Sequence, residues 1–251
     1  MEFSILTYFL LFLSGAAAGF IDSVAGGGGL ITLPALLLAG LPPQMALGTN
    51  KLQSSFGSIT SSYHYIKGGK ADLKTARTGI IFTFIGAATG TVLVQITSNE
   101  FLKKLIPFLL MGVLVYLLLS PKAGEIEREK RMSTKWFYVI FGLLIGFYDG
   151  YFGPGTGAFW VILIVFFLGH EMVKATAYTK VMNFTSNITA LTFFAIGGKM
   201  VFIPGFVMAA GEIVGATLGS KMVIKNGVKF IKPFFYTIVV IIIISLFYKH
   251  Y

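Results

Sequence analysis

The chain of 251 residues has no cysteine and little charge. The absence of cysteine excludes disulfide bonds, thiolate metal ligands and a thiol nucleophile. Only 12% of the residues are charged, whereas 55% are hydrophobic and the mean hydropathy is +0.81. A soluble domain needs more polar residues than this to cover its surface. The composition therefore predicts an all-α polytopic membrane protein.

The sequence also lacks a nucleotide-binding loop, so we expect neither ATP nor another cofactor to drive its function. The formal net charge of +10 would suit a nucleic-acid partner, but the basic residues lie in loops between apolar runs. Positive-inside topology explains this placement better, and we expect a lipid bilayer and no nucleic acid as partner. Residues 3–20 have no basic flank and no clear cleavage site after them, which indicates a retained helix rather than a signal peptide.

Ten apolar segments follow one another along the chain. Most of them approach the roughly 20 residues that a membrane-spanning helix needs. The second and the seventh have about 12 residues each and would reach only about 18 Å across an apolar core of about 30 Å. The segments are expected at residues 3–20, 30–41, 43–66, 79–97, 101–119, 136–152, 157–168, 173–196, 201–219 and 234–248.

One glycine-rich stretch occurs twice. Residues 19–29 read GFIDSVAGGGG and residues 146–157 read GFYDGYFGPGTG, and other positions match beyond them, such as Lys51 with Lys180. We predict a first repeat at residues 1–119, a charged cytoplasmic linker at 120–135 and a second repeat at 136–251. If every segment crosses, most Lys and Arg lie inside, and the two repeats are inverted with both termini outside. If the two short segments are re-entrant, the charge separation is weaker.

The two glycine stretches predict broken half-helices near the membrane midplane. A helix that starts inside the bilayer presents unpaired amide N–H groups and the positive end of its dipole, so two facing starts would form an anion site. The alternative is close packing by small residues, which is our interpretation of Gly86, Gly90, Gly211 and Gly215. The predicted substrate-binding residues of the stretches are Gly26, Gly27, Gly28, Gly29, Gly153, Gly155, Thr156 and Gly157.

Lys51 and Lys180 lie well inside long apolar segments, at matching positions of the two repeats. A charged residue at membrane depth is costly and is a functional hypothesis by default. Together they would neutralise a bound anion. The alternatives are lysines that extend to the membrane surface or pair with Asp22 or Asp149. The amides that share their helix faces complete the predicted substrate site: Asn50, Gln53 and Asn183.

Three acidic residues fall at membrane depth: Asp22, Asp149 and Glu212. Asp22 and Asp149 stand just before the glycine turns, where they would cap a broken helix, pair with the lysines or carry a coupling proton. Glu212 has no acidic counterpart in the first repeat and is the weaker candidate for a proton relay. No group of residues predicts a metal site.

The repeated Gly-x-x-Asp-x-x-x-Gly-x-Gly pattern, followed by Ala-Leu-Gly-Thr-Asn-Lys at residues 46–51, resembles the TauE/SafE family of sulfite exporter-like permeases. The resemblance covers nearly the whole chain. It implies transport of sulfur-containing anions such as sulfite, sulfoacetate and related organosulfonates, with the lysines, amides and glycine stretches named above around the substrate. The second repeat departs from the pattern, because Pro154 and Thr156 replace glycines, so the two sides of the site are expected to differ.

The sequence thus predicts a secondary transporter, and not an enzyme, that exports a small anion across the cell membrane. A passive anion channel is one alternative. Another is an intramembrane aspartyl hydrolase in which Asp22 and Asp149 share a proton and activate water. The large apolar faces allow a homodimer without requiring one.

Overall fold

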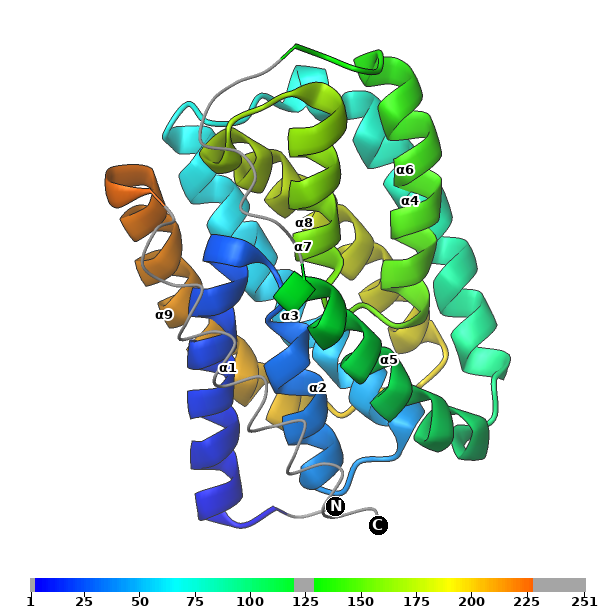
Figure 1. The fold of residues 1–251 in the computed structure, drawn as a ribbon. Coiled ribbons are helices and arrows are strands. Elements are labelled where there is room, and N and C mark those ends of the chain that lie inside the picture. Colours follow the sequence, from blue (N-terminus) through cyan, green and yellow to red (C-terminus); the bar gives the residue numbers. More distant parts are fainter. Residues whose placement is uncertain (1–2, 120–128, 228–251) are drawn as a thin grey trace.

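The computed structural model describes residues 3–119 and 129–227, which consist of helices joined by short connections (Figure 1). This confirms the all-α architecture that the composition predicts. The elements are α1 (Ile5–Ala25), α2 (Gly29–Leu38), α3 (Pro43–Lys67), α4 (Leu73–Ile96), α5 (Asn99–Leu119), α6 (Thr134–Tyr151), α7 (Thr156–Leu163), a π-helical turn η1 (Ile164–Leu168), α8 (Met172–Ile196) and α9 (Phe202–Asn226).

The first nine predicted segments each correspond to a helix, with α7 and η1 forming one of them. Two boundaries differ in a way that matters for the site or the surface. α1 continues to Ala25 instead of ending at residue 20, so that Asp22 lies within the helix. α4 begins at Leu73 instead of residue 79, so the polar residues just before the predicted apolar segment are also helical. The predicted segment 234–248 and residues 120–128 of the linker lie outside the described residues, so the division into two repeats stays a prediction.

By length and composition, three of the described helices can cross a membrane: α1, α4 and α9. α3 and α8 have 25 residues each, or about 37 Å of helix, but they carry many polar side chains. Those side chains are mostly buried in the molecule. α2 has only 10 residues, about 15 Å of helix. Among these five long helices, α1, α4 and α9 are apolar, whereas α3 and α8 are polar and bury most of their polar side chains.

Two helix pairs pack closely through glycines, α1 against α9 and α4 against α6, and Figure 1 shows each pair side by side. A Cβ on Gly211 or Gly215 would overlap backbone atoms of α1, and a Cβ on Gly86 or Gly90 would overlap backbone atoms of α6. Small residues that let two backbones approach are a common packing device in membranes. The structure therefore agrees with the packing interpretation of these four glycines.

The starts of the helices differ according to their place in the fold. The N-caps of α1, α4 and α6 are Ser4, Asp72 and Ser133, whose side chains accept hydrogen bonds from first-turn amides. The side-chain hydroxyl and backbone amide of Thr75, together with the amide of Lys74, hold the pKa of the exposed Asp72 carboxyl below its ordinary value. α2 and α7 instead begin at glycine N-caps that provide no side-chain hydrogen bond.

Candidate functional site

The two glycine breaks meet inside the helix bundle. α2 and α7 lie in the lower and upper halves of Figure 1, and their starts come together between the long helices. A Cβ built on Gly157 would lie 2.7 Å from the Cα of Gly26, and one on Gly29 would lie 3.1 Å from the Cα of Pro154. Side chains at these positions would therefore force the two breaks apart.

Glycines with positive φ angles interrupt the helix at each break. Gly26 and Gly27 have φ angles of 75° and 114°, and Gly153 and Gly155 have φ angles of 99° and 84°. These values lie in or near the left-handed region, where a Cβ clashes with the backbone, so glycine is strongly favoured at each position. Both breaks thus depend on glycines with positive φ angles, although their sequences differ.

The helix starts leave amide donors facing the site. In the first turns, the amides of Leu30 and Ile31 bond to Gly27 and Gly28, and those of Thr156 and Ala158 bond to Gly153 and Gly155. Within the described residues, no acceptor takes the N–H of Gly29 or Gly157. Both glycines line the cavity described below. Two free donors at the positive ends of two helix dipoles favour negative charge between them.

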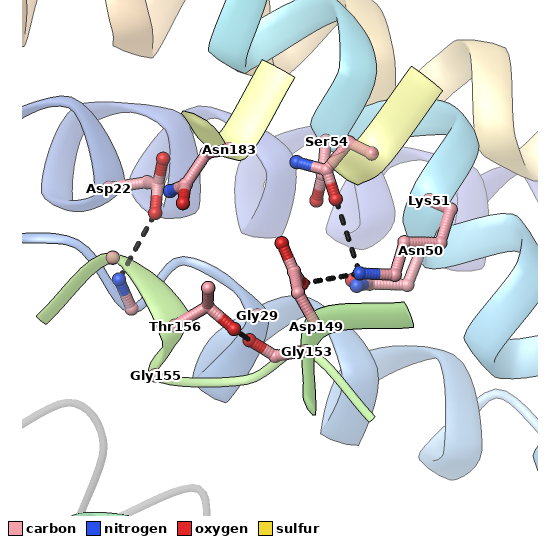
Figure 2. Close-up of a pocket in the computed structure, with 13 residues that line it drawn as sticks. Asp22, Gly29, Asn50, Lys51, Ser54, Asp149, Gly153, Gly155, Thr156 and Asn183 are labelled. Atoms are coloured by element: carbon pink, nitrogen blue, oxygen red, sulfur yellow. Dashed lines mark hydrogen bonds and ion pairs between the residues drawn. The ribbon is translucent and has the colours of Figure 1, made fainter. Parts of the chain in front are cut away.

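Lys51 reaches from α3 to Asp149 on α6, as Figure 2 shows. Its Nζ lies 2.5 Å from Oδ1 of Asp149 and 3.2 Å from Oδ1 of Asn187. The hydroxyl of Ser186 donates to Oδ2 of the same aspartate. Lys51 and Asp149 are only 1% and 3% exposed. Lys51 is therefore paired with Asp149 and does not extend to the membrane surface.

Lys180 on α8 makes the reciprocal pair with Asp22 on α1. Its Nζ lies 2.9 Å from Oδ2 of Asp22, while Oδ1 accepts the amides of Gly27 at 3.0 Å and Gly28 at 3.3 Å. Asp22 thus both pairs with a lysine and caps the first break. Each lysine bonds to the aspartate from the other half of the chain, so the pairs tie the two halves together at the breaks.

A cavity of about 30 Å³ lies between the two breaks and the polar helices α3 and α8 (Figure 2). A volume of this size holds about two water molecules. Its lining is polar, and most of it comes from residues that the sequence singles out. The lining residues are Asp22, Gly27, Gly29, Asn50, Lys51, Ser54, Asp149, Gly153, Gly155, Thr156, Gly157, Asn183 and Asn187.

Five predicted residues do not line this cavity: Gly26, Gly28, Gln53, Lys180 and Glu212. Lys180 stands behind it, paired with Asp22, and Gly26 packs against Gly157. Gln53 donates to Oδ1 of Asn50 at 2.9 Å and so orients a residue of the lining. Glu212 is buried on α9 with its carboxyl against Gly57, and it interacts electrostatically with Asp22 and Lys180.

Two lining residues, Ser54 and Asn187, are not among the predicted substrate-binding residues, although Asn187 shares the polar helix face of Lys180 and Asn183 that the sequence indicates. Each lies four positions after a predicted amide, Asn50 or Asn183, and therefore on the same helix face. That spacing is the signal by which the sequence identifies them. Two buried carbonyl oxygens near the site, Oε1 of Gln53 and Oδ1 of Asn183, have no hydrogen-bond partner within the described residues.

The geometry does not support an aspartyl hydrolase. Each aspartate is bonded to a different lysine, and neither bonds to the other. A proton shared between two carboxyl groups requires them to be close neighbours. In the described part of the chain, no group of three His, Asp or Glu residues is placed to hold a metal ion.

Comparison with known proteins gives the family. The family model described as sulfite exporter TauE/SafE matches residues 11–246. A probable membrane transporter protein of Haemophilus influenzae is 45% identical over 237 residues, which cover 93% of this chain and 91% of that protein. The probable membrane transporter protein YfcA of Escherichia coli K12 is 44% identical over 224 residues, or 89% and 83% of the two chains. A similar protein of Sinorhizobium is 41% identical over 233 residues. The resemblance seen in the motifs is therefore confirmed, and the chain is a membrane transporter protein of the sulfite exporter TauE/SafE family.

Proposed function

We propose that the protein is a secondary transporter that exports small sulfur-containing anions, such as sulfite or organosulfonates, across the cell membrane. One observation carries the proposal. Two glycine helix starts meet in the interior of the bundle, where the amides of Gly29 and Gly157 have no acceptor among the described residues and a buried lysine lies beside each break. Sulfite and sulfonate groups present three oxygens, which match such converging donors. The family's description adds the sulfur chemistry.

The direction follows from charge. A negative cell interior drives net negative charge outward by about 2.3 kcal/mol per elementary charge for each 100 mV. The two glycine breaks contact each other, and buried lysine–aspartate pairs lie beside them. These features favour a transporter that opens alternately to each side over a passive channel.

Counterflow in proteoliposomes tests this proposal. Vesicles loaded with unlabelled sulfite or sulfoacetate should accumulate the same labelled anion from outside, and the initial rate should saturate. Linear, non-saturating flux without counterflow would indicate a channel. No flux of either anion would refute the proposed substrate class.

Variants of the lysines test the site. A hydrogen bond to a charged group contributes about 1.5–3 kcal/mol, so Lys51→Ala should weaken apparent affinity about 10- to 100-fold. Lys180→Ala should reduce flux too, since Lys180 holds the aspartate that shapes the first break. Lys74→Ala, at an exposed lysine of α4, is the matched control. The site is wrong if both buried lysines can be replaced without loss of flux.

We further propose that the segments cross the cell membrane repeatedly and that their exposed apolar side chains face lipid. Examples are Ile5, Ile96 and Leu218, which are 89%, 78% and 59% exposed. Labelling single cysteines, introduced into loops of the cysteine-free chain, from each side of the membrane would test the crossings and the inverted topology. The mass of the detergent-solubilised protein would test whether it forms the homodimer that its apolar faces allow.

A further inference from the structure

The charges at the breaks already cancel before any anion arrives. Lys51 is paired with Asp149, and Lys180 is paired with Asp22. An anion that entered this neutral, buried site would bring an uncompensated charge close to two carboxylates, which is strongly unfavourable. Lys51, which lines the cavity, is already bonded to Asp149, so an anion that reaches its ammonium group must displace that carboxylate. One of the two carboxylates must therefore give up its lysine, its charge, or both.

The two aspartates differ in what they can do with a proton. All partners of Asp22 are donors: the amides of Gly27 and Gly28 and the ammonium of Lys180. Amides and ammonium groups cannot accept a hydrogen bond. A protonated Asp22 would thus present an O–H group to donors only. Its ionised form is also what holds the first break in shape.

Asp149 is bonded only to side chains, and one of them can reverse its role. The Ser186 hydroxyl donates to Asp149, yet the backbone oxygens of Met182 and Asn183 each lie 3.1 Å from the same Oγ. The hydroxyl can turn to either oxygen and accept an O–H from Asp149. Lys51 keeps Asn187 as a second partner at 3.2 Å. Both protonation states of Asp149 therefore have satisfied hydrogen bonds.

The charged surroundings of Asp149 are few. α3 contributes Lys51, α1 contributes Asp22, which lines the same cavity and is paired with Lys180 of α8, and Tyr148 is the neighbour of Asp149 on α6. The hydroxyl of Tyr148 donates to the backbone oxygen of Pro154. α7 and η1 carry no ionisable residue. The ionisable residues of α4 lie in its first two turns, away from the part that packs against Gly150. Within the described residues, Lys51 is thus the charged group that bonds directly to Asp149.

We propose that Asp149 takes up one proton when the anion binds, so that one proton crosses the membrane with each anion and a doubly charged anion such as sulfoacetate still carries one net negative charge outward. The inference rests on the proposed function. The proton comes from the aqueous phase on the loading side, forms an O–H bond on Asp149 and is released on the other side. Lys51 then faces the anion in place of the carboxylate, and the amides of Gly29 and Gly157 complete the contact. Asp22 stays ionised throughout as the cap of the first break.

Simultaneous measurement of anion and proton movement in proteoliposomes tests the coupling. Labelled sulfoacetate is the probe, because its charge does not change between pH 6 and pH 8, and an enclosed pH-sensitive dye reports protons. We expect one proton with each sulfoacetate in the unmodified protein. Because only the protonated fraction binds, apparent affinity should fall as the pH on the loading side rises, by at most about tenfold per pH unit for a single proton.

Asp149→Asn should move sulfoacetate without protons and with no such pH dependence, whereas Asp22→Asn should lose flux or folding without uncoupling. Ser186→Ala alone should slow flux, whereas the double variant Ser186→Ala/Asp149→Asn should behave like Asp149→Asn. Sulfoacetate flux without proton movement in the unmodified protein overturns the coupling but leaves the transporter intact. Proton movement that persists in Asp149→Asn and disappears in an active Asp22→Asn variant overturns the assignment. The absence of any saturable anion flux overturns the proposed function itself.

Discussion

Replacing Lys51 by methionine should destabilise the protein by about 3–5 kcal/mol, because the change leaves the Asp149 carboxylate buried without its partner. The ammonium and carboxylate are 2.5 Å apart, and their side chains are 2% and 5% exposed. At an effective dielectric constant of about 20, their attraction amounts to about 7 kcal/mol. The variant no longer has to bury the lysine charge, and this gain offsets part of the lost attraction, so the net destabilisation is about 3–5 kcal/mol.

The double variant Lys51→Met/Asp149→Leu should recover most of that stability. Both buried charges are then gone, and well-packed apolar replacements of a buried pair are often neutral or stabilising. Thermal unfolding in detergent measures the effect. A chain of this size loses about 2–4 °C for each kcal/mol, so the single variant should melt about 6–20 °C lower. Lys74→Met, at an exposed position, is the control and should change little.

The pH dependence of the single variant gives an independent check. At low pH the stranded carboxyl can bind a proton, so the deficit of Lys51→Met should be smaller at pH 5 than at pH 8. Two outcomes would refute this account of the ion pair. One is a single variant that melts with the Lys74→Met control. The other is a double variant that loses as much stability as the single one.

Three further predictions concern backbone contacts. Gly26→Ala should lower both the melting temperature and the flux, because its φ is 75° and a Cβ there would overlap the backbone of Gly157. Gly40→Ala is the control: its φ is 98°, but the space around it is open, so only the backbone strain should lower the melting temperature, and by less. Gly57→Ala should destabilise the protein by overlap with the Glu212 carboxyl, and adding Glu212→Ala should restore the melting temperature if that contact is the cause. Tyr65→Phe should cost about 1–2 kcal/mol, since its hydroxyl donates at 2.8 Å to a buried carbonyl near the end of α1; an unchanged melting temperature would mean that water replaces the bond.

The sequence was sufficient for the features that arise locally. Apolar runs separated by charged loops identify the helices, since each must bury its backbone in its own hydrogen bonds inside a membrane. The glycine stretches identify the breaks, because a chain that needs positive φ at several neighbouring positions has little alternative to glycine. Lys51 and Asp149 are conspicuous because charges within apolar runs are costly. The amides of α3 and α8 follow from their helical spacing.

The partners of those charges were decided only by the tertiary structure. Lys51 could pair with Asp22 or with Asp149 as far as the sequence shows, and the fold selects Asp149, which is 98 positions away. The contact between Gly26 and Gly157 has the same origin. Local spacing describes which face of a helix is polar, but not which face it meets. Which faces meet depends on the packing of α1 on α9 and of α4 on α6. Each of these pairs joins a helix from the first half of the chain to one from the second half, as do the contacts between the two breaks and between each lysine and its aspartate.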